Sequence, residues 1–292
     1  MMELLRIELF KIFKRPRTYI AFAVIALIIL LIQVALKYSG DDYMSILASG
    51  VSGSFEIRPG EWLNGYLVCF IILNLLLVHV PILVALVAGD MISGEANMGT
   101  LRLLVSRPVS RTRLLLIKFL AAAIYTLVLL IWVAILALGV SMLMFGTNSM
   151  FVARETESNV IAAYDVLWRY GAAFLLAALG LVTVAALSVM LSAFAETSIG
   201  PIVATVSVLI ILTILTELQI PFYDETIKPY LFTTHMLGWK GFFYVKGVDG
   251  VTVDGSINNL GSVLRSAAIL VAYSAAFLGT AIWYFRKKNI LS

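Results

Sequence analysis

The chain has few charged side chains, one cysteine and two histidines among its 292 residues. Only 13% of the residues are charged and 61% are hydrophobic, whereas soluble domains carry about 25% charged and about 45–50% apolar residues. This composition excludes an ordinary soluble globular domain and makes the lipid bilayer the expected solvent for most of the chain. Because Cys69 is the only cysteine, no disulfide can form within one chain.

Motifs for catalysis, cofactors and metals are also missing. The sequence contains no His-Glu-x-x-His, Gly-x-Ser-x-Gly or Cys-x-x-Cys. Its two histidines, His79 and His235, lie in different segments, so we expect no histidine metal site within the chain. Gly94 and Gly99 have the spacing of the two P-loop glycines, but the lysine that would hold the phosphates is absent. We therefore expect no catalytic, cofactor or metal site in this chain.

Six apolar stretches are long enough to cross the hydrocarbon core of a bilayer, which needs roughly 20 residues of helix. None alternates apolar and polar residues with a period of two, which favours helices over a barrel. The predicted fold class is an all-α membrane protein in which residues 18–292 form a single six-span transmembrane domain. The predicted spans are approximately 19–36, 62–88, 119–145, 170–194, 199–218 and 263–284.

The first 17 residues are predicted to form an amphipathic helix that lies in the membrane interface. The alternative is an ordinary basic flank that only fixes the topology. The apolar side chains share one helical face and most charges lie opposite: Met2, Leu5, Leu9, Ile12 and Phe13 against Glu3, Lys11, Lys14 and Arg15.

The distribution of charge predicts the orientation. With six spans, one side of the membrane holds both termini, the 89–118 loop and the 195–198 turn. That side carries 13 of the 21 Lys and Arg residues but only 5 of the 17 Asp and Glu residues. The positive-inside rule then places both termini in the cytoplasm of a multi-pass protein of the cell membrane. The basic excess reflects topology and requires no nucleic-acid partner.

Polar residues within the second predicted span have two readings. Pro81 is expected to kink this helix, because it removes a hydrogen-bond donor and clashes one turn back. Asn74 and His79 are costly against lipid, so they should face other helices or a cavity. They form either part of a translocation path or, as we favour, interhelical hydrogen bonds.

The 219–262 segment, on the other side of the membrane, is rich in aromatic residues in its first half. Such residues favour the membrane–water boundary, so part of this segment is expected to dip into the outer leaflet or to lie on it. Val248, Val251 and Val253 alternate with Asp-Gly pairs in the second half, which predicts tight turns or a small hairpin.

The loop between the second and third spans has a helical pattern of its own. Met98, Leu101, Leu104 and Val105 recur at helical spacing. Arg107-Pro108 is expected to end that helix, and Ser110 is a predicted N-cap for the helix that continues into the third span. The pattern predicts a short helix parallel to the membrane. A solvated basic loop with a turn at the membrane surface is the alternative.

This loop resembles the inner loop of ABC-2 type transporter permeases. The resemblance lies in Asp90-x-Ile92-Ser93-Gly94-Glu95, in Gly99-Thr100-Leu101, in Ser106-x-Pro108-Val109-Ser110-Arg111 and in Lys118. In that family the loop holds the coupling helix, which seats in a groove of a cytosolic ATPase subunit. The six-span layout, the N-terminal helix and the short turn after the fourth span extend the resemblance to the whole chain.

The resemblance implies a permease subunit of an ATP-binding-cassette transporter, an exporter that pairs with a second permease, identical or homologous. Two cytosolic ATPase subunits would carry ATP and magnesium, so this chain would not itself be an enzyme. The alternative is a stand-alone ion-coupled secondary transporter, which would need a charge deep in a span; an intramembrane enzyme ranks last. Glu196 would be a second, minor ATPase contact. The implied ATPase-coupling residues are Glu95, Met98, Gly99, Thr100, Leu101, Arg102, Leu104 and Pro108.

Overall fold

The computed structural model of the protein describes residues 2–50, 63–101, 109–154, 157–218, 226–243, 257 and 259–288. Regular structure in these residues is helical, apart from one two-stranded hairpin. The elements are α1 (Met2–Lys14), α2 (Pro16–Gly50), α3 (Gly65–Leu75), α4 (His79–Ala88), α5 (Ser93–Asn97), α7 (Arg111–Ala134), the π-helix η1 (Ile135–Val140), α8 (Ser141–Phe145), β1 (Met150–Arg154), β2 (Glu157–Ile161), α9 (Ala163–Phe194), α10 (Ile199–Glu217), the 3₁₀ helix η2 (Lys228–Tyr230), α12 (Phe232–Met236), the 3₁₀ helix η3 (Leu237–Phe242) and α13 (Leu260–Lys287).

Five helices in the described part of the chain are long and apolar enough to cross a membrane. The bent pair α3 and α4 makes a sixth if the two helices form one span. These helices are consistent with the predicted multi-pass, α-helical membrane protein. The five are Pro16–Gly40, Arg111–Phe145, Ala163–Phe194, Ile199–Glu217 and Leu260–Lys287.

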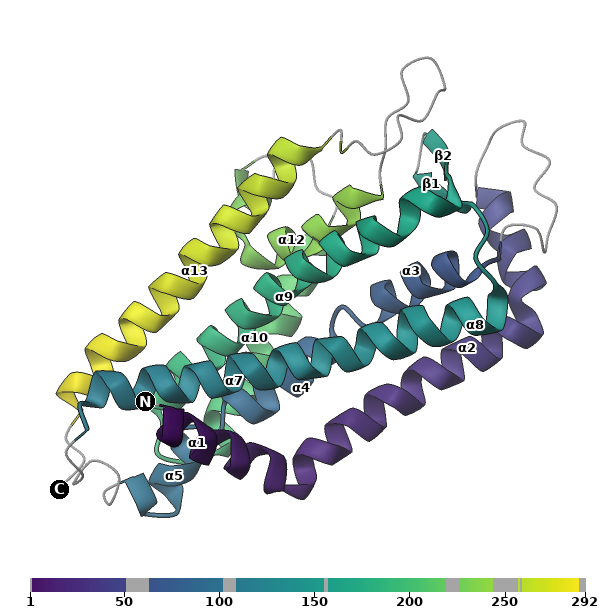
Figure 1. Ribbon diagram of the computed structural model, residues 1–292. Helices are drawn as coiled ribbons and strands as arrows, with labels where there is room; N and C mark the ends of the chain where they lie inside the picture. The colour runs from purple at the N-terminus through teal and green to yellow at the C-terminus, as the bar shows by residue number, and fades with distance from the viewer. Residues whose placement is uncertain are drawn as a thin grey trace.

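Helix α9 lies at the centre of the bundle, where it contacts α4, α7, α10 and α13. Small side chains such as Ala185, Ala186 and Ser188 are buried along it, and small residues let neighbouring helices approach closely in a membrane. Helix α13 covers one flank of the bundle and α2 covers the opposite flank (Figure 1).

The two ends of the bundle differ in what they carry. Helices α1 and α5 and the C-terminal end of α13 lie at one end, which we call the terminal end (Figure 1). The hairpin β1–β2 and helix α8 lie at the opposite end, which we call the hairpin end. An even number of crossings brings both termini to the same end, so this arrangement agrees with counting α3 and α4 as one span.

The second predicted span is broken as its proline suggested. α3 and α4 are inclined at 53° to each other, and the break falls at residues 76–78, just before Pro81 in the first turn of α4. Because Pro81 has no N–H, the carbonyl of Leu77 loses its helical partner, and the proline ring crowds the same carbonyl. The chain therefore leaves the helix one turn before the proline.

The third span is longer than predicted. It starts at Arg111 instead of residue 119 and runs through η1 to Phe145. The predicted N-cap is confirmed, since Ser110 Oγ accepts a hydrogen bond of 3.3 Å from the backbone N–H of Arg113. At the π-helix, Gln33 donates from Nε2 to the Leu136 carbonyl at 2.8 Å and to Ser141 Oγ at 2.9 Å. A π-turn disturbs the regular hydrogen-bond ladder of the helix, and the Gln33 side chain supplies a donor to the Leu136 carbonyl.

The hairpin was not predicted, and α9 begins earlier than the expected residue 170. Met150–Arg154 pairs antiparallel with Glu157–Ile161. The first turns of α9 contain Asp165 and Arg169, whose ion pair of 2.6 Å is buried. Because the two charges neutralise each other, the helix can extend through residues whose charges the sequence pattern assigned to a loop.

The described part of the 219–262 segment folds back against the bundle. α12 and η3 pack among α9, α10 and α13, and Phe232, Trp239 and Phe242 are buried. These aromatic side chains thus face the protein instead of the membrane boundary. The turns predicted around Val248, Val251 and Val253 lie outside the described residues.

Helix α1 has the predicted amphipathic character. Its apolar face packs on the bundle, mainly on α7, with Ile12 buried and Leu9 and Phe13 against the core. Ile7 and Phe10 are exposed on another face. The predicted apolar face therefore covers protein, and a second apolar pair remains available to a membrane surface.

Candidate functional site

The described part of the segment that resembles a coupling loop lies at the terminal end, where α1, α4, α5 and α7 meet (Figure 1). Helix α5 holds only five residues, and so short a helix is not stable alone in water. Its start is fixed to α9: the backbone N–H groups of Ile92 and Ser93 both donate to Ser192 Oγ, at 3.1 Å and 2.9 Å. The end of α9 therefore holds α5 in place.

Glycines shape both ends of this segment. A Cβ at Gly94 would lie 2.4 Å from Asp90 Oδ1, so the Asp90 carboxylate would have to move to admit any larger residue at this position. Gly99 follows α5 with φ of 71°, in the left-handed region that favours glycine. The backbone N–H of Gly99 donates to the Ala96 carbonyl at 3.0 Å. The chain thus turns sharply on leaving α5.

Two carboxylates and two ammonium groups form a closed ion ring behind α5. Lys118 of α7 lies 3.0 Å from Glu8 Oε2 and 2.7 Å from Glu95 Oε2. Lys11 of α1 lies 2.8 Å from Glu8 Oε1 and 2.8 Å from Glu95 Oε1. Lys118 is only 1% exposed, and Glu8 and Glu95 are each 5% exposed. The ring (Glu8, Lys11, Glu95 and Lys118) therefore joins α1, α5 and α7 through buried charges.

A second ion cluster lies beside the ring, around the buried Asp90 carboxylate. Arg15 Nη1 lies 2.5 Å from Asp90 Oδ2, and Arg17 Nη2 contacts the same oxygen. Both arginines are half-buried and stand where α1 ends and α2 begins. This cluster therefore fixes the α1–α2 corner to the residues that follow α4.

The local electrostatics favour the charged forms at this site. Burial alone would raise the pKa of the Glu8 carboxyl, but Lys118 and Lys11 outweigh it and hold that pKa below its ordinary value. Burial would also raise the pKa of Asp90, but hydrogen bonds to Arg17 and other neighbours lower it overall. For Lys11, the two glutamates outweigh burial and raise the pKa of its ammonium group.

A family model described as "Protein of unknown function (DUF2705)" matches residues 23–291, which is nearly the whole chain. The chain belongs to this family. A comparison with curated proteins finds no match. The interpretation of the terminal-end site in this DUF2705 member therefore depends on the geometry of its residues.

The predicted coupling residues of this DUF2705 member fall into two groups. Glu95 and Leu101 are buried within the chain, at 5% and 3% exposure, instead of facing outward. Met98 is 57% exposed, beside Gly99, and Thr100 Oγ1 donates to the Glu95 carbonyl at 3.2 Å. Among the described coupling residues, Met98 is therefore the large apolar side chain that a partner can reach. Arg102, Leu104 and Pro108 lie outside the described residues.

The turn between α9 and α10 lies at the same end, and its Glu196 is exposed. Lys288 donates from Nζ to the carbonyls of Ala193 and Ala195, at 3.1 Å each. It satisfies carbonyls that the end of α9 leaves without helical partners. Burial lowers the pKa of the Lys288 ammonium group, although the charge of Glu196 opposes this effect.

Asn74 bonds within α3, and His79 bonds back to the last residue of α3, so both contacts stay within the broken span. Asn74 Nδ2 donates to the Phe70 carbonyl at 2.8 Å, and His79 Nδ1 lies 2.9 Å from the Leu75 carbonyl. His79 is exposed at the break between α3 and α4. The favoured interhelical hydrogen bonds are thus not found for these two residues. Their role in a translocation path stays a prediction.

Sequence reasoning missed the ion ring of this DUF2705 chain, although one signal was available. Glu8 lies on the same face of α1 as Leu5 and Ile12, which are three residues before it and four after it. An acid on the apolar face of an amphipathic helix is costly unless a cation meets it. That signal points to a buried cation but cannot say that it is Lys118.

Proposed function

We propose that this chain is the permease subunit of an ATP-binding-cassette transporter of the ABC-2 type, and that it works as an exporter. ATP and magnesium bind to separate cytosolic ATPase subunits, and the permease pairs with a second permease subunit, identical or homologous. The terminal end faces the cytoplasm of the cell because it collects most of the Lys and Arg residues. The proposal rests on the resemblance of the 90–118 segment and on the geometry of that end.

The observation that carries the proposal is the buried ion ring. It ties α5, which lies in the connection between spans two and three, to α7 through Glu95 and Lys118. α7 is continuous with η1 and α8 as far as Phe145. Because α5 is held by a buried ion pair, a force on α5 passes to the third span without being absorbed in a loose loop. A coupling element needs this property.

The same geometry gives two of the proposed coupling residues different roles. Leu101 packs in the core of the chain and anchors the segment, whereas Met98 is exposed. In the proposed complex Met98 is an apolar contact with the ATPase subunit. A Leu101→Asp variant is therefore a poor test, because a buried charge would disturb the permease fold itself.

Co-purification tests the proposal. The tagged chain is extracted from native membranes in a mild detergent, and the bound proteins are identified by mass spectrometry and assayed for ATP hydrolysis. We expect an ATP-binding-cassette ATPase to accompany the parent chain and to be largely lost from Met98→Asp, since a carboxylate at an apolar contact is desolvated without a partner. Glu196→Ala is the matched control at the same end, and it should retain the ATPase.

Two outcomes would contradict this assignment. The absence of any ATP-binding-cassette subunit from the parent complex would remove the basis for an ATP-driven transporter. Transport that proceeds without ATP and follows an imposed ion gradient would favour a secondary transporter. Retention of the ATPase by Met98→Asp, with its complete loss from Glu196→Ala, would show instead that the 195–198 turn is the main contact.

A further inference from the structure

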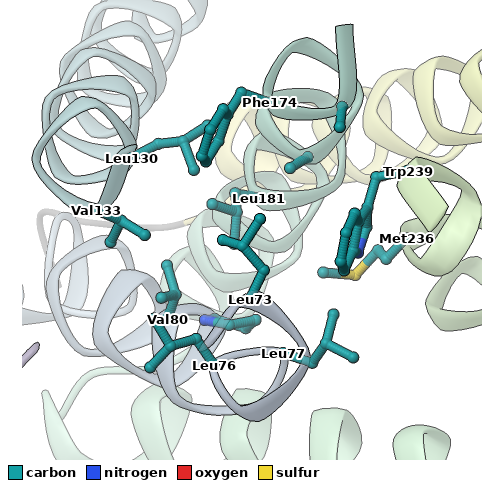
Figure 2. A pocket seen from close by; sticks show the side chains of 13 residues that line it. Leu73, Leu76, Leu77, Val80, Leu130, Val133, Phe174, Leu181, Met236 and Trp239 are labelled. Carbon is teal, nitrogen blue, oxygen red and sulfur yellow. The ribbon is translucent and has the colours of Figure 1, made fainter. Parts of the chain in front are cut away.

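An apolar cavity lies where α3 breaks into α4, far from the ion ring. It holds about 540 Å³ of empty space including its open side. Its wall comes from the broken span, from α7, from α9 and from the α12–η3 segment. Figure 2 shows Leu73, Leu77 and Val80 on one side, with Phe174, Leu181 and Trp239 facing them.

The chemistry of the wall excludes water as a stable occupant. The lining side chains are all apolar or aromatic, and among them only Trp239 carries an N–H group (Figure 2). A buried water needs two to four polar partners, which this wall cannot supply. The lining residues belong mainly to membrane-spanning helices, whose surroundings are hydrocarbon. The occupant that suits this wall is a hydrocarbon chain.

A second cavity adjoins the first and is more polar. The two share Leu77, Pro81 and Met236 in their walls. The second is also lined by three threonines and by the carboxylate-bearing Glu217. Thr216 and Glu217 stand in the last turn of α10. The hydroxyl groups of Thr216 and Thr233 lie 2.7 Å apart. The second cavity therefore offers hydroxyl groups beside the apolar wall of the first.

We infer that the apolar cavity holds an acyl chain of one membrane lipid. The chain lies against Phe174 and Trp239. The break before Pro81 contributes Leu76, Leu77, Val80 and Pro81 to the wall of this cavity. The inference does not depend on the proposed transport function.

Photo-crosslinking of the intact protein tests this inference. The purified chain is reconstituted in phosphatidylcholine vesicles that contain a trace of phosphatidylcholine with a diazirine in one acyl chain. After illumination, the labelled residues are mapped by mass spectrometry. We expect adducts on Trp239, which is only 3% exposed, as well as on outward residues such as Leu175, which is 73% exposed. Without a chain in the cavity, only the outward residues become labelled.

Filling the cavity supplies the matched comparison. Ala177→Leu places extra carbon atoms in the apolar cavity, whereas Ala272→Leu adds the same atoms at an exposed position of α13. Losing the burial of about two methylene groups weakens chain binding by roughly tenfold. Trp239 labelling should fall by about that factor in Ala177→Leu and stay unchanged in Ala272→Leu, while Leu175 labelling stays constant in both.

Three results would overturn the inference. One is labelling of Leu175 without Trp239 in the parent chain. Another is equal labelling of Trp239 in the Ala177→Leu and parent chains, provided that circular dichroism shows both to be folded. The third is labelling of Trp239 by a soluble single-chain amphiphile but not by phosphatidylcholine, which would assign the cavity to a passing amphiphile instead of a membrane lipid.

Discussion

Replacing Lys118 by methionine should release α1 from the bundle. Lys118 has 1% of its side chain exposed and neutralises Glu8 and Glu95, whose side chains are each 7% exposed. Methionine keeps much of the length but removes the charge, so two buried carboxylates share Lys11, which is 36% exposed. Removing one partner of a buried ion pair costs about 3–5 kcal/mol. Local detachment of α1 from the bundle should reduce this free-energy cost, because it returns Glu8 to water.

Cysteine accessibility measures this release. Ile12 is 4% exposed on the face of α1 that covers the bundle, and the native Cys69 is fully buried. In an Ile12→Cys, Cys69→Ala chain, a maleimide reagent reports how often α1 opens. A cost of about 3 kcal/mol corresponds to roughly a hundredfold rise in the labelling rate when Lys118→Met is added. The denaturation midpoint of the remaining bundle should change less.

Two further variants decide whether charge is the cause. Lys14 is an exposed cation on the same helix, so Lys14→Met should change stability by less than about 0.5 kcal/mol. Adding Glu8→Gln and Glu95→Gln to Lys118→Met removes the stranded charges and should restore most of the protection. Unchanged labelling of Ile12→Cys in Lys118→Met, with an unchanged denaturation midpoint, would refute the reasoning.

Low pH and the substitution Gly94→Ala should both destabilise the terminal end. The pKa values of Glu8 and Asp90 are lowered in the folded chain, so their stabilisation is complete above the ordinary values of 4.5 and 3.8 and is lost as the pH falls through the folded values. The Tm in detergent should therefore drop below about pH 4.5, less steeply in Glu8→Gln, and an identical slope would contradict this. Gly94→Ala should lower stability by about 1–3 kcal/mol because its Cβ displaces the Asp90 carboxylate. Gly279→Ala, where a Cβ meets nothing within 4 Å, is the control, and equal Tm values for the two variants would show that the Asp90 contact is unimportant.

Much of the bundle could be predicted because bilayer solvation is a local property of sequence. Apolar length located the spans, and Pro81 located the break in the second one to within a turn. Ser110 marked the start of α7, because capping depends on a few neighbouring residues. Boundaries went wrong where charges were neutralised within the fold, as at Asp165 and Arg169. A sequence pattern counts such charges as polar, although the folded helix buries them as a pair.

The ion ring could not be predicted because its partners are distant in the chain. Glu8 and Lys118 are 110 residues apart, and Lys11 and Glu95 are 84 residues apart. A basic loop and an amphipathic helix each suggest contact with solvent or lipid headgroups. Only the packing of α1 on α7 turns these separate charges into a closed, buried ring.

The rigidity of α5 must therefore come from its surroundings. A helix of five residues has too few internal hydrogen bonds to hold its shape. Ser192 fixes its first N–H groups, and Lys118 fixes its middle through Glu95. In the proposed transporter, neutralising Glu95 would leave Met98 exposed for the ATPase but break the link to α7. Binding and transport would then separate: a Glu95→Gln permease should retain the ATPase but lose ATP-driven transport. Loss of both together would place Glu95 in the contact itself.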